Sequence, residues 1–482
     1  MTRKLTCLLI ALCLLFSTVY VAVAEEEKPV LRYLGRDATF DLSNSPMIEI
    51  LQNITGYTVE YEALPAGEEG LTKLMLLLSS GTKYDIVNGF TTYFDKALAA
   101  GAIMPLDDLL QNAPNVLACV PEDSASWTRV TGSDGKIYGI PQLMPTGGPV
   151  STIAVRKDLL DAAGIEMPTT AEEFYNMLVA VKEAYPDMIP LTTDENCSLP
   201  PVISAFDCYQ SWYQLDDGTW VPQALNENYK NYIAFLNKLY TEGLIDVEFP
   251  ANDDATRKAK FTSGQAVMTY FQYWEGSGFY SAMETTDPNA VIDYIPFLRD
   301  EHGTAGVEVN LGLEKIFFIP ISAEHPEDAI AWADAFMANF KAIYIGEEGI
   351  DHEIVDGQYR PIMPQFSVHD TVWFFMPAID EAVAFEYWQA RVRKSEEVER
   401  GYMDTFALKV EDLNIVTSPL EMLAPNDELV TLMSQAGINF SNAMVKLITG
   451  SVSMDEYDTA VDQYNKDGGK RIVELANAMI AG

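Results

Sequence analysis

Residues 58–87, TVEYEALPAGEEGLTKLMLLLSSGTKYDIV, contain the signals of a strand, a helix and a second strand in succession. Thr58–Ala63 alternates apolar with acidic side chains, which is typical of a half-buried strand. Glu68–Leu78 has the apolar spacing of a helix that ends before Gly81, and Tyr84–Val87 is a short apolar strand. A strand, helix and strand in this order pair in parallel through a right-handed crossover. The stretch therefore predicts an α/β fold.

The same alternation continues on both sides of this unit. Before it, Pro29–Leu34 reads as a strand and Ser45–Ile54 as a helix that Gly56 can end. Downstream, Ile137–Ile140 is a further strand that ends at a proline. The segment Pro141–Pro149 then holds three prolines and two glycines in nine residues, so it continues neither a strand nor a helix. We expect the chain to leave the first α/β unit there.

The rest of the chain is richer in helix signals. Thr170–Glu173 is a capping box before a helix that ends at Pro186. Pro326 suits the first turn of a helix with an apolar face as far as Phe340. From Asn426 onward the pattern is helical to the end. We therefore expect a helical C-terminal region.

The length indicates the number of domains, and the charge excludes some classes of ligand. With 482 residues, two to three domains are expected. The 31 Lys and Arg against 71 Asp and Glu give a formal charge of −40, which argues against binding nucleic acid or anionic lipid through a basic surface. Because 48% of the residues are apolar, the chain has ample material for a folded core.

Residues 1–24 have the features of an export signal. Two basic residues precede the apolar run Leu8–Val21, and small residues lead to Ala24 before an acidic start. We expect cleavage after Ala24, the alternative being a retained membrane anchor. Cys13 lies inside the apolar run, so we do not expect a lipid anchor. The mature chain is then exported, to the periplasm or the cell surface.

Cleavage would leave three cysteines, Cys119, Cys197 and Cys208. Three thiols permit at most one internal bridge, and the short loop from Cys197 to Cys208 is the candidate. The alternative is three buried thiols that act as small apolar side chains.

The usual catalytic signatures are missing from the sequence. It has no G-x-S-x-G, H-E-x-x-H, C-x-x-C, Walker or G-x-G-x-x-G motif, and its four histidines have no metal-ligand spacing. We therefore expect neither an enzyme nor a cofactor. The competing hypotheses are a secreted carbohydrate-active hydrolase and a surface signalling or adhesion module.

Several short motifs, in order along most of the mature chain, resemble a known family. The motifs are Gly81–Val87, Ala100–Asp108, Asp134–Pro141, Val155–Leu160, Ala163–Ile165, Pro168–Thr170, Phe261–Met268 and Gly450–Tyr457. In these motifs the chain is similar to the extracellular solute-binding proteins of ABC importers, in particular to family 1 proteins for sugars and oligosaccharides.

The resemblance implies a two-lobe, periplasmic-binding-protein-like (type II) α/β fold with hinge-connected lobes. The first lobe would comprise 25–145 and 288–343, and the second 146–287 and 344–482, with crossings near Pro145, Pro288 and Tyr344. The protein would act as a monomer that captures a small solute, expected to be a carbohydrate, and delivers it to an ABC transporter permease. No bond would be made or broken.

A sugar site needs flat aromatic rings together with polar side chains. Trp274 is the first candidate because it follows a predicted strand end. Asn88 is expected at the carboxyl end of the strand Tyr84–Val87, where open α/β sheets place ligands. For each aromatic residue, packing in the core is the alternative interpretation. For Trp212 and Trp373 the core interpretation is favoured. No metal is expected, since the segment Pro186–Leu191 is shorter than the calcium-holding loop of related alginate-type proteins. The candidate ligand-binding residues are Trp274, Tyr273, Asn88, Tyr93, Tyr209, Trp212, Asn310 and Trp373.

Overall fold

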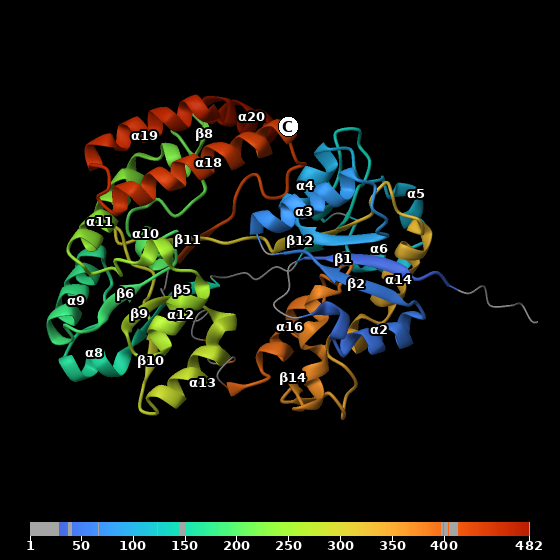
Figure 1. The fold of residues 1–482 in the computed structure, drawn as a ribbon, viewed down its shortest axis with the longest axis horizontal. Helices are drawn as coiled ribbons and strands as arrows, with labels where there is room; N and C mark the ends of the chain where they lie inside the picture. The colour runs from blue at the N-terminus through green and yellow to red at the C-terminus, as the bar shows by residue number, and fades with distance from the viewer. Residues whose placement is uncertain are drawn as a thin grey trace, which may run out of the picture.

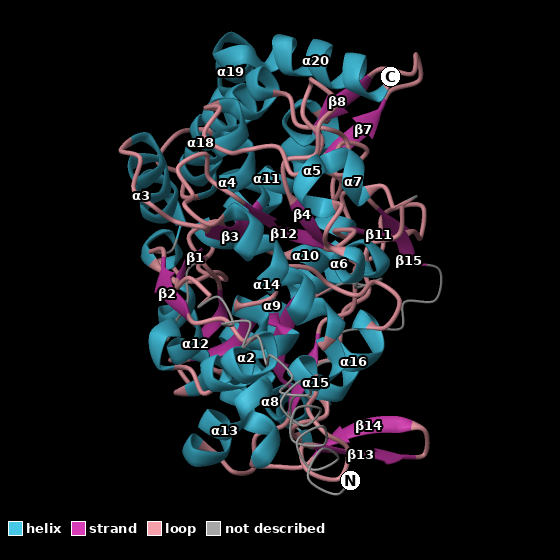
Figure 2. Cartoon of the chain, turned by 90° about the vertical axis from the view of Figure 1, so that its right-hand side faces the viewer, coloured by secondary structure: helices cyan, strands magenta, loops and turns pink. Residues whose placement is uncertain are grey.

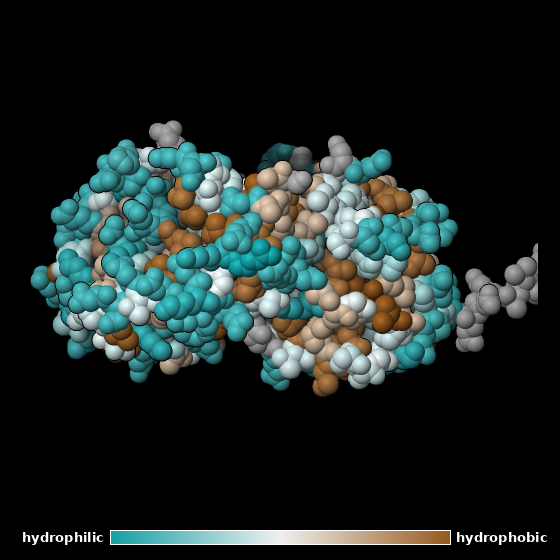
Figure 3. All heavy atoms as spheres, turned by 90° about the horizontal axis from the view of Figure 1, so that it is seen from above, coloured by the Kyte–Doolittle hydropathy of each residue, from teal (hydrophilic) through white to brown (hydrophobic). Residues whose placement is uncertain are grey.

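Two α/β lobes lie side by side in the computed structural model (Figure 1). The predicted signal sequence, 1–24, lies outside the described residues. Seen from above, the molecular surface narrows to a waist between two rounded bodies (Figure 3). The structure describes residues 28–36, 41–65, 67–122, 124–143, 150–396, 399, 403 and 413–481.

The first lobe is built on a five-stranded sheet in the order β2-β1-β3-β12-β4. Strand β1 pairs in parallel with β2 and β3, as the strand-helix-strand signals predict. Strand β12 pairs antiparallel with β3 and β4, so a distant segment completes the sheet. The strands are β1 (Leu31–Gly35), β2 (Val59–Ala63), β3 (Ile86–Phe90), β4 (Ile140–Leu143) and β12 (Leu313–Phe318).

Helices cover this sheet because each has an apolar side that the sheet buries. Helix α2 ends at Gly56, whose φ of 70° is a left-handed conformation that glycine adopts without strain. Trp332 of α14 is fully buried and stacks on Phe317 of β12. The helices are α2 (Met47–Thr55), α3 (Gly67–Ser79), α4 (Thr91–Ala99), α5 (Asp107–Leu110), α6 (Pro114–Cys119), α7 (Ser126–Arg129), α14 (Pro326–Ala338), α15 (Phe340–Tyr344) and α16 (Ala384–Val392).

The second lobe has a four-stranded sheet in the order β10-β5-β9-β6. Strand β9 is central, antiparallel to β5 and parallel to β6. Its strands are β5 (Ser151–Arg156), β6 (Ile189–Thr192), β9 (Ala266–Gln272) and β10 (Ile292–Tyr294), and a separate hairpin joins β7 (Trp212–Gln214) to β8 (Trp220–Pro222).

The helices of this lobe include the predicted capped one. The Thr170 hydroxyl accepts a hydrogen bond from the Glu173 amide at 3.2 Å and caps α9. The expected C-terminal helices are also present, and α18 runs from near α4 across the second lobe (Figure 1). The helices are α8 (Lys157–Ala163), α9 (Ala171–Ala184), α10 (Pro200–Ser204), α11 (Glu227–Thr241), α12 (Asp254–Thr262), α13 (Gly276–Thr286), α18 (Asp427–Ile448), α19 (Tyr457–Tyr464) and α20 (Lys470–Ile480).

The lobe boundaries differ from the expected ones at two places. Strand β10 belongs to the second sheet, so the return near Pro288 was wrong. The chain stays on the second lobe until β11 (Ala305–Glu308) and joins the first sheet at β12. The expected first crossing at Pro145 lies outside the described residues, although the strands before and after it belong to different sheets.

The crossing near Tyr344 was also wrong. Tyr344 and the apolar residues from Phe366 to Ala390 are buried in the same core as β1 and α14, so the chain remains on the first lobe through α16. A hairpin of β13 (His352–Val355) and β14 (Gln358–Pro361) projects at the end opposite α19 and α20 (Figure 2). The chain is back on the second lobe by β15 (Leu413–Val416), which pairs in parallel with β11.

The predicted bridge between Cys197 and Cys208 is absent. Both cysteines are free, and both pack into the apolar core of the second lobe. The Cys208 thiol lies 3.9 Å from the carbonyl oxygen of Ile203, at the end of the short helix α10 that separates the two cysteines in the sequence. The alternative of three buried thiols therefore holds. A cysteine thiol packs in an apolar core as a small apolar side chain and needs no disulfide bond there.

Among the described residues, no helix combines the length and the apolar character needed to cross a bilayer.

Candidate functional site

A cavity of about 1280 Å³ lies between the lobes and extends beneath α18. The first lobe contributes Arg36 at the end of β1 and Trp373, Phe374 and Trp388. The second lobe contributes residues from the ends of β5 and β9 and from α11 and α18. Because both lobes supply walls, a change in their separation would change the shape of the cavity.

Aromatic rings form a continuous group at one wall. Tyr273 and Trp274 belong to the short 3-10 helix η4 (Tyr273–Glu275), which follows β9 directly. The ring of Tyr273 meets that of Trp274 edge-on, with 4.9 Å between centroids, and meets that of Trp388 edge-on at 5.3 Å. Since Trp388 lies on the first-lobe helix α16, this contact joins the two lobes.

Trp274 is the most exposed of these rings. Its side chain is 51% exposed, which is unusual for a residue type that is highly buried on average. An exposed indole beside a cavity offers a flat apolar face to a ligand.

Tyr209 also lines the cavity, where it contacts the paired strands β11 and β15. Its hydroxyl accepts a hydrogen bond from Nδ2 of Asn414 at 2.8 Å. A Cβ atom built on Gly306 would lie 2.0 Å from Cζ of Tyr209, so only glycine lets the ring pack this closely on β11. Partial burial raises the pKa of Tyr209 above its ordinary value, and the phenol therefore stays a neutral hydrogen-bonding group.

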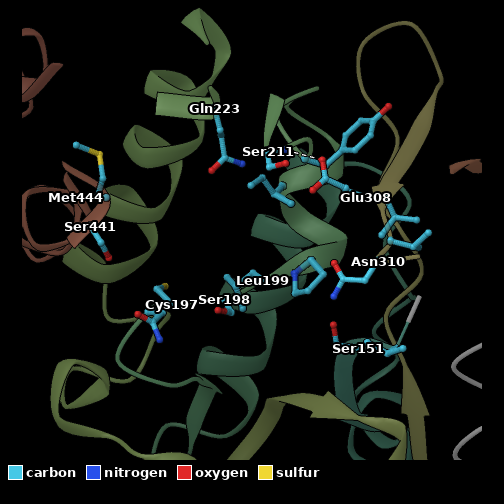
Figure 4. Close-up of a pocket in the computed structure, with 18 of the residues that line it drawn as sticks. Ser151, Cys197, Ser198, Leu199, Ser211, Gln223, Glu308, Asn310, Ser441 and Met444 are labelled. Carbon is cyan, nitrogen blue, oxygen red and sulfur yellow. Dashed lines mark hydrogen bonds between the residues drawn. The ribbon is translucent and has the colours of Figure 1, made fainter. Parts of the chain in front are cut away.

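Polar groups face the same space (Figure 4). Glu308 accepts a hydrogen bond from the Ser211 amide at 2.6 Å, which fixes its carboxylate at the end of β11. Gln223 donates to the carbonyl oxygen of Cys208 at 2.7 Å and points into the space between α18 and the Glu308–Asn310 segment (Figure 4). Amide, hydroxyl and carboxylate groups of this kind bind a ligand through hydrogen bonds.

Trp373 lies on the first-lobe side. The Nζ atom of Lys315 is 4.0 Å from the centre of its ring and donates to its carbonyl oxygen. The cation holds the indole against β12 while part of the ring lines the cavity. The core interpretation favoured for Trp373 is thus only partly correct, because it packs against the core and also faces the cavity.

Five of the eight predicted residues line this cavity, namely Trp274, Tyr273, Tyr209, Asn310 and Trp373. Asn88, Tyr93 and Trp212 do not.

The three others have structural surroundings. Asn88 is 1% exposed, because the chain at Met376 covers the strand end where we expected an open edge, and its side chain donates to the Met376 carbonyl. Tyr93 is buried on α4, where its ring meets Phe90 edge-on. Trp212 is 2% exposed in the second-lobe core, as the core interpretation predicts.

Sequence reasoning missed other residues of the cavity wall. Arg36 lies two residues after the predicted strand Pro29–Leu34, so its position near a strand end was an available signal. Trp388 and Phe374 had no such signal, because the segment that carries them was assigned to the other lobe. Arg391 also lines the cavity, and its guanidinium donates to the carbonyl oxygens of His369 and Asp370.

The lining offers no catalytic pair. Among the described residues that line the cavity, Glu308 is the sole carboxylate, whereas glycoside hydrolysis by the common mechanism needs two. Over the described ranges, His, Cys, Asp and Glu side chains form no group of three that could hold a metal ion. The arrangement can therefore bind a molecule between two walls, but the lining supplies no set of groups for hydrolysing one.

Comparison with known proteins identifies the class. Residues 44–339 match the family model of the bacterial extracellular solute-binding proteins, and the chain belongs to this family. The family consists of binding proteins, so the chain is a solute-binding protein and not an enzyme.

Individual relatives agree with this assignment. The chain is 22% identical over 461 residues to lipoprotein LipO of Bacillus subtilis, a match that covers 90% of this chain and 88% of LipO. It is 26% identical over 348 residues to the fructooligosaccharide ABC transporter substrate-binding protein FusA of Streptococcus pneumoniae, covering 66% and 63% of the two chains.

Solved structures confirm the two-lobe fold. The alginate-binding protein AlgQ2, solved without calcium ion, superimposes with a TM-score of 0.74 at 18% identity, over 95% of this chain and 99% of AlgQ2. FusA in complex with kestose gives a TM-score of 0.72 at 17% identity, over 94% and 99% of the chains. The predicted fold class is therefore confirmed.

Proposed function

We propose that this protein captures a carbohydrate, and by the size of the cavity an oligosaccharide, outside the cytoplasmic membrane. The observation that carries the proposal is the cavity itself, with aromatic rings and hydrogen-bonding side chains on walls from both lobes. At about 1280 Å³ it exceeds the roughly 300–1,000 Å³ of most small-molecule sites. Two relatives support the class of ligand, since one is named for fructooligosaccharides and another for polygalacturonan and rhamnogalacturonan.

The chemistry of the walls suits a sugar. A pyranose or furanose ring has apolar C–H faces and a rim of hydroxyl groups. Trp274, Tyr273 and Trp373 would cover such faces, while Asn310 and Tyr209 would exchange hydrogen bonds with the rim. Coverage by both lobes would favour a closed arrangement when the ligand is bound.

Delivery to an ABC transporter permease completes the proposal. The protein would be exported, lose residues 1–24, and act as a monomer at the periplasmic or outer side of the membrane. If the measured mass of the exported protein equals that of a chain beginning at Glu25, this processing is supported. A mass that includes Arg3 and Lys4 would contradict it.

A thermal-shift screen of mono- and oligosaccharides tests the ligand class. A ligand that binds only the folded protein adds about 2.7 kcal/mol to the free energy of unfolding at 100 times its Kd, and so raises the melting temperature. Amino acids and nucleotides serve as controls, and chromatography checks that the bound sugar is recovered unchanged. A shift with amino acids or nucleotides and none with any saccharide would refute the proposal.

A further inference from the structure

The short 3-10 helix η4 carries two aromatic rings of the cavity wall. It carries Tyr273, whose ring meets that of Trp388 of the first lobe, and Trp274, whose ring meets that of Tyr273; all three residues line the cavity. Trp274 is 51% exposed, so its own packing fixes its place only in part. The backbone of η4 must therefore be held by other contacts if the rings are to keep one arrangement.

Glu275 supplies these contacts from the last position of η4. Its side chain is 2% exposed and does not line the cavity. Oε2 accepts a hydrogen bond from the backbone amide of Gln272 at 3.1 Å, which ties the end of η4 to its start. Oε1 lies 2.9 Å from Nη2 of Arg257 and 2.5 Å from Nζ of Lys258. One carboxylate thus joins both ends of η4 to helix α12.

Arg257, which pairs with Glu275, also connects η4 to strand β9. Its side chain is fully buried, Nη1 donates to the carbonyl oxygen of Tyr270 at 2.6 Å, and the guanidinium lies 4.8 Å from the centre of the Tyr270 ring. Burial alone would lower the pKa of Arg257, but pairing with Glu275 and Asp254 raises it above its ordinary value. The group therefore stays charged, and both ends of η4 are held to one buried cation.

A buried ion pair needs a reason other than stability. The desolvation of two charges often costs as much as their attraction returns, and apolar residues of similar size commonly stabilise as well or better. A charged pair does, however, impose one geometry through its directional hydrogen bonds, which an apolar contact does not. Here that geometry is imposed on η4, beside the cavity.

We propose that the Arg257–Glu275 pair is a positioning device that fixes the Tyr273–Trp274 rings in the wall of the cavity. As a determinant of ligand recognition, it rests on the proposed carbohydrate-binding function. Neither Arg257 nor Glu275 lines the cavity, so both act through the two rings.

The test follows the indole of Trp274 in the ligand-free protein. The chain has seven tryptophans, so 5-fluorotryptophan labelling gives a small set of 19F signals, and the one missing in Trp274→Phe belongs to Trp274. In Glu275→Gln this signal is expected to shift and change in width. The signal of Trp388 can follow it, because Trp388 meets the ring of Tyr273, while the signals of the other five tryptophans stay in place. A general loss of stability would not single out one tryptophan.

Asp254→Asn is the matched control. Asp254 also pairs with Arg257, at 2.8 Å, but its side chain is 62% exposed and no hydrogen bond of its carboxylate to η4 is found among the described residues. This variant is expected to leave the Trp274 signal unchanged. If Glu275→Gln does not fold, the double variant Arg257→Met with Glu275→Leu removes both charges together and is read in the same way.

Calorimetric titration with kestose as the probe adds the functional measurement. Glu275→Gln is expected to weaken binding about tenfold or more, and Asp254→Asn less than about twofold. Lack of kestose binding by the unchanged protein would count against that ligand, while the 19F signals still decide the positioning. A Trp274 signal that matches the unchanged protein in both Glu275→Gln and the double variant would overturn the inference.

Discussion

Replacing Trp274 with alanine separates a ligand contact from a structural residue. A tryptophan side chain offers up to about 250 Å², and at 51% exposure about half of that remains for a ligand to cover. At about 25 cal/mol per Å², full coverage would be worth at most about 3 kcal/mol, or about 150-fold in Kd. A sugar ring stacked on one face covers less, so we expect binding to weaken by roughly 10- to 150-fold.

The same substitution should affect folding much less. The ring meets Tyr273 edge-on, and such a pair is worth about 0.5–1.5 kcal/mol. A fully buried tryptophan would cost about 3–5 kcal/mol of folding free energy. We therefore expect the ligand-free melting temperature to fall only slightly.

Calorimetry with the saccharide found in the thermal-shift screen measures the first effect, and ligand-free thermal unfolding measures the second. Trp220→Ala is a matched control, because Trp220 packs on the core of the same lobe and does not line the cavity. It should lower the melting temperature and leave Kd unchanged. Binding by Trp274→Ala within about twofold of the unchanged protein would refute the reasoning.

Three further predictions concern other parts of the molecule. Gly306→Ala should displace the Tyr209 ring, since the new methyl group would lie 2.0 Å from it, and should weaken saccharide binding in calorimetry. Burial lowers the pKa of His369 below its ordinary 6.5, so the unfolded chain takes up a proton first as the pH falls. The free energy of unfolding should then drop below pH 6.5 by at most about 1.4 kcal/mol per pH unit, and urea titrations should show a smaller drop for His369→Gln. Alkylation in denaturant without reductant should label both Cys197 and Cys208, and a protected pair would contradict the structure.

The two lobes are joined by more than the crossing segments. Tyr273 contacts Trp388 across the cavity, and Lys96 of α4 donates to Thr431 of α18 at 3.5 Å. Both contacts are made by side chains on separate helices, and neither belongs to a segment that crosses between the lobes. Contacts of this kind can form or break as the lobes move, so they would report on closure around a ligand.

The sequence predicted the fold because its main signals are local. The alternation in Thr58–Ala63 and the glycine that ends α2 act within a few residues, and the structure contains the strand and the helix end that they predict. The capping threonine before α9 is equally local. Polar and aromatic residues just after a strand, such as Trp274, could also be found, since strand ends are where open sheets place ligands.

What the sequence by itself determined was therefore the α/β class, most of the elements and the family. The partner of each apolar face was decided only by the tertiary structure, because hydrophobic burial is non-directional and a buried side chain does not specify which core it joins. For this reason the segment from Phe366 to Ala390 packs on the first lobe and brings Trp388 to the cavity, although its sequence fits either lobe. The same physics places the chain at Met376 over Asn88, so a strand end that looked open in the sequence is closed in the fold.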